Sequence, residues 1–321
     1  MELLVRARQV PVETIDLHCI KASGVELLVR RDDLVDEQLS GNKFYKLFYN
    51  IECAEQLGYR QILSFGGAYS NHLYSLAAAG KRLGFATVGV VRGERPVILS
   101  PTLLDAERWG MRLVFVGRAD YRELTQTSAS LAVLLSRLRH ELGGFYCIPE
   151  GGANLAGAQG MQVLGRALDE QLQGKFDSVC LACGTGTGLA GVAAALGGTK
   201  SVLGFSVLKG SSGVDAGIGS EVARLTEQLV TTNTGQADNW RLISGFHGGG
   251  YGKRLPPYLQ RFWQTFEQET GLQLDPVYTL KMFWGITRLA QQGYWPKGSR
   301  VVAIHSGGLQ GRRGFTAPNG S

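Results

Sequence analysis

Short apolar runs alternate with longer amphipathic stretches along almost the whole chain. The runs are rich in Val, Ile, Leu and Phe without strict polar–apolar alternation, which is typical of strands covered on both faces of a sheet. The stretches between them carry apolar residues at helical spacing. Strands are predicted over residues 26–30, 61–65, 87–91, 112–116, 145–148, 178–182, 201–207, 240–243 and 300–305. Helices are predicted over residues 43–58, 71–83, 101–109, 122–142, 156–172, 188–197, 214–229, 256–270 and 279–291.

The alternation of strands and helices predicts an α/β fold with mostly parallel sheets. At roughly 150 residues per domain, 321 residues suggest two domains, and two open sheets fit this length better than one. Ligands of such sheets bind beyond the carboxyl ends of the strands, where loops lead into helices. The junctions from strand to helix are therefore the expected positions of functional residues.

The chain contains 45 glycines, which is roughly twice the usual share of ~7%. They cluster around residues 65–67, 151–160, 184–191, 245–252 and 307–311, largely at the predicted junctions. Glycine clusters between apolar runs predict tight turns at which the backbone approaches a ligand or another segment.

The formal net charge of +6 comes from scattered residues rather than from a basic stripe interleaved with aromatic rings. This pattern argues against nucleic-acid binding and favours an anionic small substrate or cofactor. The N-terminus lacks a basic segment followed by an apolar one, and no run of ~18 apolar residues occurs. We therefore predict a cytoplasmic protein with no membrane partner.

The five cysteines are odd in number, so a secreted disulfide framework is not expected. Cys180 and Cys183 have C-x-x-C spacing, but a zinc site would need a second ligand pair, which the sequence lacks. Cys180 also lies inside a predicted buried strand. We therefore predict small core residues and no metal site.

One glycine-rich junction connects the predicted strand 178–182 to the helix that follows it. Glycines expose backbone N–H groups, threonines add hydroxyls, and the helix N-terminus adds its dipole, so the loop suits a phosphate group. A plain glycine turn with capping threonines is the alternative interpretation. The residues of this loop are Cys183, Gly184, Thr185, Gly186, Thr187 and Gly188.

The same loop matches a G-x-G-x-x-G pattern at Gly186, Gly188 and Gly191, which suggests a dinucleotide site and a nicotinamide-dependent oxidoreductase. Such a site requires a carboxylate at the end of the next strand, about 20 residues further on. The predicted strand 201–207 is instead followed by Lys209 and no carboxylate. The missing acid weakens this alternative.

Two further junctions carry polar side chains suited to catalysis. Lys43 lies at a helix start, where the helix dipole opposes a cation and favours the neutral amine that Schiff-base chemistry requires. On these residues alone, an exposed surface lysine is the simpler interpretation. Ser70 and Asn71 begin another helix and suit a carboxylate, although either could be only a helix cap. His72 beside them is more often a packing residue than a base.

Three junctions nearer the C-terminus carry hydroxyl groups. Tyr251 lies in a loop with four glycines between residues 247 and 252, which is typical of a loop shaped around a ligand or of a flexible surface loop. Tyr278 and Thr279 begin a helix, and Ser306 follows the last predicted strand. The alternative is a core or capping role for Tyr278 and Thr279 and a capping role for Ser306.

Taken in order, these segments resemble the D-cysteine desulfhydrase and 1-aminocyclopropane-1-carboxylate deaminase family. Members of that family are fold-type II, tryptophan-synthase-β-like pyridoxal phosphate enzymes. The resemblance spans about residues 10 to 311. It is carried by Gly41-Asn42-Lys43, Ser70-Asn71-His72, Asp275-Pro-Val-Tyr-Thr279 and His305-Ser-Gly-Gly308.

The resemblance implies that pyridoxal 5′-phosphate is the cofactor and that Lys43 binds it through a Schiff base. It also implies that Asn71 bonds the ring oxygen of the cofactor. Ser70 resembles the residue that grips the substrate carboxylate or assists proton transfer.

The remaining site residues follow from the same resemblance. Residues 183–188 match the loop that holds the cofactor phosphate. Tyr251 and Tyr278 match two active-site tyrosines of the family. Ser306 matches the residue near the pyridine nitrogen.

The resemblance further implies two open-sheet α/β domains. A large cofactor-binding domain would combine residues 1–48 with 156–321, and a smaller domain of residues 49–155 would close over the substrate. Family members are commonly homodimers, so a homodimer acting on a small amino acid is expected.

The chain departs from the family pattern near the expected site. Tyr69 stands where the family usually has glutamine, and Phe44 and Tyr45 stand where a small or basic pair is common. The C-terminus is short after Gly311. These differences bear on the substrate rather than on the cofactor.

The expected reaction is α,β-elimination on an amino acid such as D-cysteine, which gives a 2-keto acid and ammonia. In the ring-opening deaminases, a glutamate follows the tyrosine matched by Tyr278, and its carboxylate keeps the pyridine nitrogen protonated. Thr279 occupies that position here, and a neutral hydroxyl cannot balance a positive charge. Loss of a thiol is therefore favoured over opening of a cyclopropane ring, and a non-catalytic binding protein on the same fold is a further alternative.

Overall fold

The computed structural model describes residues 2–39, 41–198, 200–208, 214–230, 238–250 and 255–315. Within these ranges it contains a six-stranded sheet in the order β1-β2-β10-β7-β8-β9 and a four-stranded sheet in the order β5-β4-β3-β6. The strands are β1 (Val12–Thr14), β2 (Glu26–Arg30), β3 (Gln61–Gly66), β4 (Ala86–Arg92), β5 (Arg112–Val116), β6 (Tyr146–Cys147), β7 (Ser178–Cys183), β8 (Ser201–Ser206), β9 (Trp240–Ile243) and β10 (Arg300–Ile304). The α-helices are α1 (Glu2–Gln9), α2 (His18–Lys21), α3 (Asn42–Gln56), α4 (Asn71–Leu83), α5 (Pro101–Arg108), α6 (Arg118–Gln126), α7 (Ser128–Leu142), α8 (Leu155–Leu172), α9 (Thr187–Leu196), α10 (Val214–Leu229), α11 (Pro257–Thr270) and α12 (Thr279–Gln291). Short 3₁₀ helices are η1 (Asp32–Leu34), η2 (Glu150–Gly152) and η3 (Leu309–Gly314).

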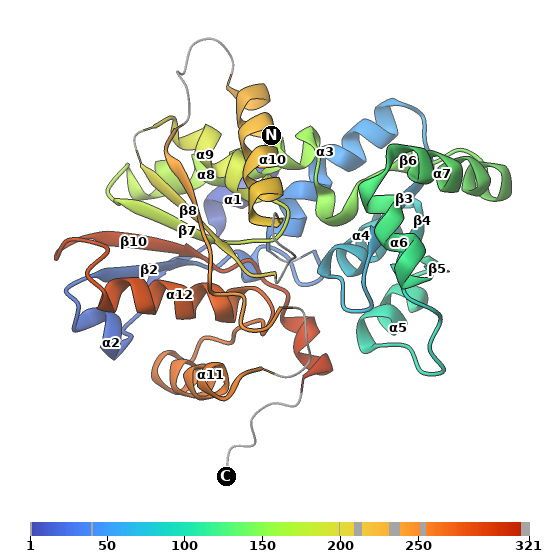
Figure 1. Ribbon diagram of the computed structural model, residues 1–321. Helices are drawn as coiled ribbons and strands as arrows, with labels where there is room; N and C mark the ends of the chain where they lie inside the picture. The colour runs from blue at the N-terminus through green and yellow to red at the C-terminus, as the bar shows by residue number, and fades with distance from the viewer. Residues whose placement is uncertain are drawn as a thin grey trace.

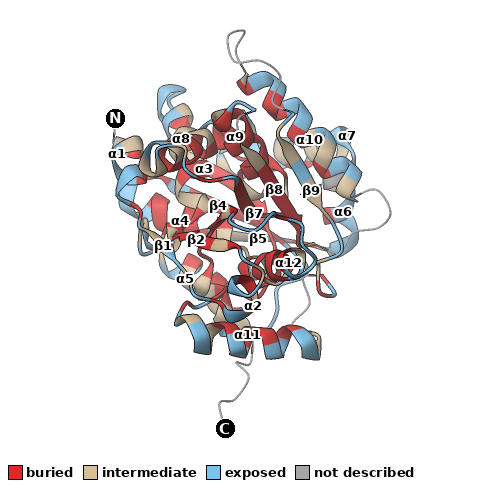
Figure 2. Cartoon of the chain, turned by 90° about the vertical axis from the view of Figure 1, so that its left-hand side faces the viewer, coloured by how far each residue is buried: buried red, intermediate tan, exposed pale blue. Residues whose placement is uncertain are grey.

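The six-stranded sheet is parallel apart from its edge strand β1, which runs antiparallel to β2. Alternate side chains of its strands enter two separate apolar clusters, as the two-residue period of a strand requires. Val179 and Leu181 of β7 pack with helices α8, α9 and α10, whereas Cys180 packs with α2, α11 and α12. Figure 2 shows β7 and β8 buried beneath these helices. Burial on both faces explains why the strands appear in the sequence as continuous apolar runs.

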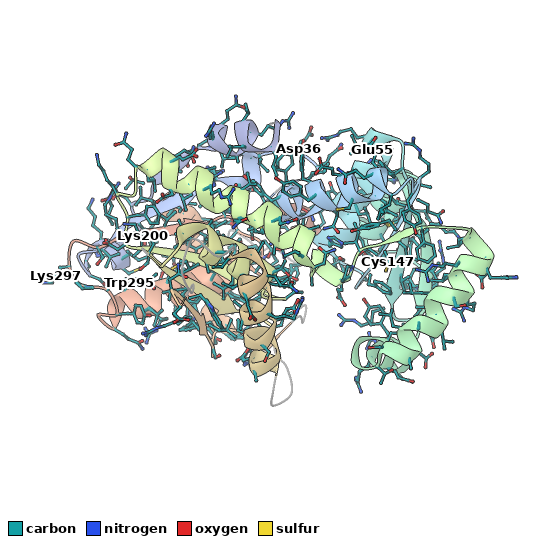
Figure 3. The ribbon with its side chains drawn as sticks, turned by 90° about the horizontal axis from the view of Figure 1, so that it is seen from above. Asp36, Glu55, Cys147, Lys200, Trp295 and Lys297 are labelled. Carbon is teal, nitrogen blue, oxygen red and sulfur yellow. The ribbon has the colours of Figure 1, made fainter. Side chains whose placement is uncertain are left out.

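The four-stranded sheet is parallel throughout and is also covered on both faces. Ile62 of β3 packs with α3, α4 and α5, while Leu63 packs with α7. In Figure 1 the six-stranded sheet lies on the left, the four-stranded sheet on the right, and α3 between them. Seen from above in Figure 3, Cys147 marks the part built on the four-stranded sheet, and Lys200 and Trp295 mark the other part.

All nine predicted strands are confirmed, each within one residue of its predicted ends. The helix predicted over residues 122–142 is instead two helices, α6 and α7, because Thr127 between them is extended at φ −126° and ψ 127°. The helix α1 and the segments β1 and α2 were not predicted. The segments β1 and α2 span only three and four residues, which is too short to show a period.

No helix in the described ranges is long and apolar enough to cross a membrane. Among the same residues, no group of His, Cys, Asp and Glu side chains is arranged to hold a metal ion. All five cysteines carry free thiols, and Cys180 is completely buried in β7, as its predicted core role requires.

Candidate active site

A cavity of about 1610 Å³ lies between the two sheets, at the carboxyl ends of their parallel strands. One part of its wall comes from the start of α3 and from the loop between β7 and α9. The facing part comes from the loops after β3, β4 and β5 and from η2. The predicted site residues that line it are Lys43, Ser70, Asn71, Cys183, Gly184, Thr185, Gly186, Gly188 and Tyr278.

Lys43 enters the cavity from the first turn of α3. Gly41 before it has a φ of +66°, and a Cβ there would collide with the carbonyl oxygen of Ser306, so the chain can enter α3 this way only with glycine. The Nζ of Lys43 donates a hydrogen bond to the carbonyl oxygen of Gly151 at 3.1 Å. Burial, and then repulsion from Lys46, holds the pKa of Lys43 well below its ordinary value. The position therefore favours the neutral amine that nucleophilic chemistry requires.

Lys46, which was not predicted as a site residue, follows Lys43 by one helical turn. Its Nζ reaches the same Gly151 oxygen at 3.5 Å, and its side chain is buried. Burial lowers the pKa of Lys46 to about 8, while Cys183 acts in the opposite direction. The three-residue spacing places both lysines on one helix face, and that spacing is the signal that could have identified Lys46.

A buried polar network fixes the start of α3 against β2. The hydroxyl of Tyr45 donates to Oδ1 of Asp32 at 2.6 Å, and Nε of Arg30 donates to Oδ2 of Asp32 at 3.2 Å. These three side chains are completely buried. The ring of Phe44 packs edge-on against that of Tyr45, and neither is among the described residues that line the cavity. This pair therefore anchors the helix that carries Lys43 and does not line the cavity.

The loop between β7 and α9 is the segment predicted to hold a phosphate. Gly186 caps α9 with a φ of +80°, and a Cβ there would lie 2.7 Å from Cγ2 of Val222. The hydroxyl oxygens of Thr185 and Thr187 lie 3.0 Å apart. The first N–H groups of α9 have no carbonyl partner within the helix, and the helix dipole makes this end positive. The loop therefore offers hydrogen-bond donors and a positive potential to a phosphate group.

The start of α4 forms a second positive end at the cavity. Ser70 is its N-cap, and the Ser70 Oγ accepts a hydrogen bond from the backbone N–H of Leu73 at 3.2 Å. The Oδ1 of Asn71 accepts a hydrogen bond from Nε2 of Gln310 at 2.7 Å. The capping role considered for Ser70 is therefore present, and both Ser70 and Asn71 still line the cavity.

His72 is buried beside the two lysines. Its Nε2 lies 2.9 Å from the hydroxyl of Ser64, which donates to the carbonyl oxygen of Ile148 at 2.8 Å. A hydroxyl has one proton, so Ser64 must accept from Nε2–H, and the Nδ1 of His72 is unprotonated. Burial, and then the charges of Lys43 and Lys46, keep the pKa of His72 well below its ordinary value. His72 is therefore a neutral interior residue.

Tyr278 reaches the cavity from the residue before α12. The Oδ1 of Asp275 accepts hydrogen bonds from the backbone N–H groups of Val277 at 3.1 Å and of Tyr278 at 2.5 Å. Burial raises the pKa of Asp275 to about 7. The hydroxyl of Thr279 accepts from the backbone N–H of Asp275 at 2.8 Å and lies 3.2 Å from its carbonyl oxygen. Thr279 is completely buried, so its hydroxyl serves the helix start and is not directed at a ligand.

Three other residues named from the sequence have different outcomes. Tyr251 lies outside the described residues. Ser306 follows β10 but is not among the described residues that line the cavity, and its role near a pyridine nitrogen stays a prediction. Tyr69 does line the cavity, and its ring packs against Gly314 of η3, where a Cβ would collide with it. The C-terminal segment therefore holds Tyr69 at the edge of the cavity.

The wall beside the four-stranded sheet contains polar residues that the sequence did not indicate. The hydroxyl of Tyr121 donates to Oε2 of Glu150 at 2.9 Å. The guanidinium carbon of Arg92 lies 5.8 Å from the centre of the Tyr121 ring. Arg118 lines the cavity from the first residue of α6. These residues come from separate segments, so no local motif marks them.

Comparisons with known proteins agree with one another. Residues 7–307 match the family model of the pyridoxal-phosphate dependent enzymes. A putative 1-aminocyclopropane-1-carboxylate deaminase of Pyrococcus abyssi is 31% identical over 294 residues, which cover 90% of this chain and 86% of that protein. The mitochondrial bifunctional D-cysteine desulfhydrase/1-aminocyclopropane-1-carboxylate deaminase of Arabidopsis thaliana is 28% identical over 314 residues. The match covers 90% of this chain and 74% of that protein. The crystal structure of a homologue of 1-aminocyclopropane-1-carboxylate deaminase is similar, with a TM-score of 0.80 and 26% sequence identity. The match covers 94% of this chain and 90% of that chain.

Proposed function

The chain belongs to the pyridoxal-phosphate dependent enzyme family, and from that membership we propose that it catalyses α,β-elimination on a small amino acid such as D-cysteine. The chain is an enzyme that uses pyridoxal 5′-phosphate, and its two-sheet α/β fold is the fold-type II architecture expected from the sequence. The nicotinamide-dependent alternative, which rested on Gly186, Gly188 and Gly191, is therefore wrong. The products of the proposed reaction are a 2-keto acid and ammonia.

The residues in the cavity fit this cofactor. A Cβ on Gly151 would lie 3.3 Å from the methyl carbon of Thr185 and 3.8 Å from the Nζ of Lys43, so the glycine-rich loop and the Lys43 amine approach the same point. We propose that residues 183–188 hold the phosphate, with Lys46 as a nearby cation. Lys43 would hold the aldehyde carbon of the cofactor, and Asn71 would bond its ring oxygen.

When bound, pyridoxal phosphate supplies an electron sink for the negative charge that develops at the substrate α-carbon. The Nζ of Lys43, whose pKa lies well below its ordinary value, takes the α-proton. The carbonyl oxygen of Gly151 orients this nitrogen. The hydrogen bond from Gln310 to Asn71 fixes the side chain that faces the ring oxygen.

Ser70 and the positive end of α4 hold the α-carboxylate of the substrate. The bond between the β-carbon and sulfur breaks, and the hydroxyl of Tyr278 gives its proton to the departing sulfur. With D-cysteine, one molecule of water is consumed, and pyruvate, ammonia and hydrogen sulfide are released. Asp275 supports this role because its carboxylate fixes the backbone that carries Tyr278.

The side chain at residue 279 decides between elimination and opening of a cyclopropane ring. The ring-opening deaminases have a glutamate at this position, and here the side chain is a neutral hydroxyl engaged with the backbone of Asp275. No carboxylate is therefore available at residue 279 to keep the pyridine nitrogen protonated. A less protonated ring is a weaker electron sink, which is sufficient when a thiol leaves readily from the β-carbon.

The test is release of 2-keto acid by the purified enzyme from D-cysteine, L-cysteine, β-chloro-D-alanine and 1-aminocyclopropane-1-carboxylate. Free pyridoxal phosphate and the Lys43→Ala variant serve as controls for turnover without the active site. Release from D-cysteine or β-chloro-D-alanine is expected. Turnover of the cyclopropane substrate alone would contradict elimination. No turnover of any of the four by the cofactor-loaded protein would leave the cofactor in place and contradict the proposed substrate.

The domain division, the oligomeric state and the location belong to the same proposal. We propose that residues 1–48 and 156–321 form the cofactor-binding domain and that residues 49–155, which contain the four-stranded sheet, form the domain that closes over the substrate. A homodimer is proposed from the resemblance to the family. A cytoplasmic location is supported by the five free thiols.

A further inference from the structure

The cavity has a cationic wall that the proposed chemistry leaves unused. Arg92 is the last residue of β4, Arg118 is the first residue of α6, and Arg122 follows Arg118 by one helical turn. All three line the cavity on the side of the four-stranded sheet. The cofactor phosphate, in contrast, is assigned to the loop between β7 and α9.

Two of these arginines have no acidic partner. Neither Arg92 nor Arg118 forms an ion pair within the described residues, whereas Arg82, Arg95 and Arg313 outside the cavity each pair with a carboxylate. An unpaired arginine facing a cavity is suited to a carboxylate, sulfonate or phosphate group, because its planar fork presents two parallel N–H donors. The wall is therefore an anion site with its donors available.

The position of Arg92 relates this wall to the proposed substrate site. A Cβ on Gly67 would lie 3.3 Å from Nη2 of Arg92, and the carbonyl oxygen of Gly67 accepts a hydrogen bond from the N–H of Ser70 at 3.0 Å. Arg92 thus lies beside the end of α4 to which we assign the α-carboxylate. The Nε of Arg118 lies 4.0 Å from the Cβ position of Gly93, the residue after Arg92, and both arginines line the same cavity.

The acids on this side do not neutralise the wall. Glu150 has one oxygen engaged by the hydroxyl of Tyr121 at 2.9 Å, and Glu94 also lines the cavity. Neither forms an ion pair with Arg92 or Arg118. The cavity of about 1610 Å³ also exceeds the ~300–1,000 Å³ of most ligand pockets, which leaves room for the cofactor and for a charged side chain.

We propose that the substrate is an acidic amino acid, whose side chain ends in an anionic group held by Arg92 and Arg118. This inference rests on the proposed function, because it names the substrate class of the same site. The α-carboxylate would bind at the end of α4, and the second anion would bind at the cationic wall. D-cysteine is then an accepted analogue rather than the best ligand.

The experiment compares each acidic amino acid with its neutral counterpart, in both enantiomers. The pairs are aspartate with asparagine, O-phosphoserine with serine, and cysteate with serine. Dissociation constants are measured by calorimetry on the holoenzyme, and 2-keto acid release is measured in parallel. The double variant Arg92→Gln/Arg118→Gln is compared with Arg112→Gln, which removes an exposed arginine from the opposite end of β5, outside the cavity wall.

At least one acidic member should bind the wild type roughly tenfold or more tightly than its neutral counterpart, and the double variant should lose this preference while Arg112→Gln keeps it. The inference is overturned if no acidic member binds more tightly than its counterpart, or if the double variant weakens both equally. Binding that depends on Arg92 and Arg118 without any keto-acid release would contradict the proposed function and leave the anion site standing. Turnover of neutral amino acids, with no tighter binding of the acidic members, would support the proposed function and overturn the anion site.

Discussion

The side-chain nitrogens of Lys43 and Lys46 converge on one backbone carbonyl oxygen, that of Gly151, at 3.1 Å and 3.5 Å. A protonated Lys46 repels a proton on Lys43 and so favours the neutral form of Lys43. The pKa of Lys43 is well below its ordinary value, and the pKa of Lys46 is about 8. The arrangement therefore favours the neutral form of Lys43, which is the form that acts as a nucleophile and a base.

Removing the charge of Lys46 should raise the pKa of Lys43. In Lys46→Met the repulsion disappears, so the protonated form of Lys43 becomes more stable and its neutral fraction at a given pH falls. The rate at which the apoprotein captures pyridoxal phosphate should then rise to half its maximum at a pH about one unit higher than in the wild type. The pH profile of that rate is the measurement.

Lys46→Arg is the matched control because it keeps a positive charge at the same position. Its midpoint should stay close to that of the wild type, even if the larger side chain slows capture at every pH. An unchanged or lower midpoint in Lys46→Met would contradict electrostatic coupling between the two lysines.

Gly186→Ala should weaken cofactor binding more than it weakens the fold. A Cβ at this position meets Val222 at 2.7 Å, and the φ of +80° is unfavourable for alanine, so the loop must shift away from its phosphate-binding conformation. The dissociation constant for pyridoxal phosphate should rise about tenfold or more, because hydrogen bonds to a charged group are lost. Cofactor absorbance during dialysis gives this constant.

Gly197→Ala is the control for the backbone cost. Gly197 caps the other end of α9 with a φ of +52°, and a Cβ there meets nothing within 4 Å. Both variants should lose about 1 kcal/mol of unfolding free energy to the positive φ. Gly186→Ala should lose more because of the contact with Val222, and only Gly186→Ala should lose cofactor affinity. Equal cofactor affinities in the two variants would argue against the loop as the phosphate site.

Tyr45→Phe should destabilise the protein without changing its substrate preference. The variant removes the donor to Asp32 at 2.6 Å in a completely buried network, which should cost about 1–3 kcal/mol of unfolding free energy. Tyr49→Phe on the same helix removes a hydroxyl from a partly buried residue and should cost less than about 0.5 kcal/mol. Denaturant unfolding measures both, and a changed ratio of kcat/KM between two substrates in Tyr45→Phe would show that this residue does influence specificity.

The elements of the fold could be predicted because each sheet is covered on both faces. Burial of both faces makes every parallel strand a local apolar run, such as Val179 to Leu181 in β7, and a local pattern needs no knowledge of the rest of the structure. The exceptions follow from the same reasoning. The edge strand β1 is short and partly exposed, so it carries no apolar run.

The site could be predicted only in part, for a related physical reason. Lys43, Ser70 and residues 183–188 lie at junctions where loops enter helices, and the chemistry of each junction is visible locally. The roles of Tyr45 and of Arg92 depend on contacts with distant segments. The Tyr45 hydroxyl is engaged by Asp32, and Arg92 becomes important only because the loop after β4 faces the cavity.

The central claim is that Lys43, and not the more deeply buried Lys46 beside it, holds the cofactor. Borohydride reduction of the holoenzyme should fix the cofactor to the lysine that carries it, and peptide mapping then identifies that residue. Trypsin does not cleave after a modified lysine, so modification of Lys43 should give a peptide that continues through Phe44 and Tyr45 to Lys46. A label on Lys43 that disappears in Lys43→Ala is the predicted result, and a label on Lys46 or on any other lysine would contradict the account.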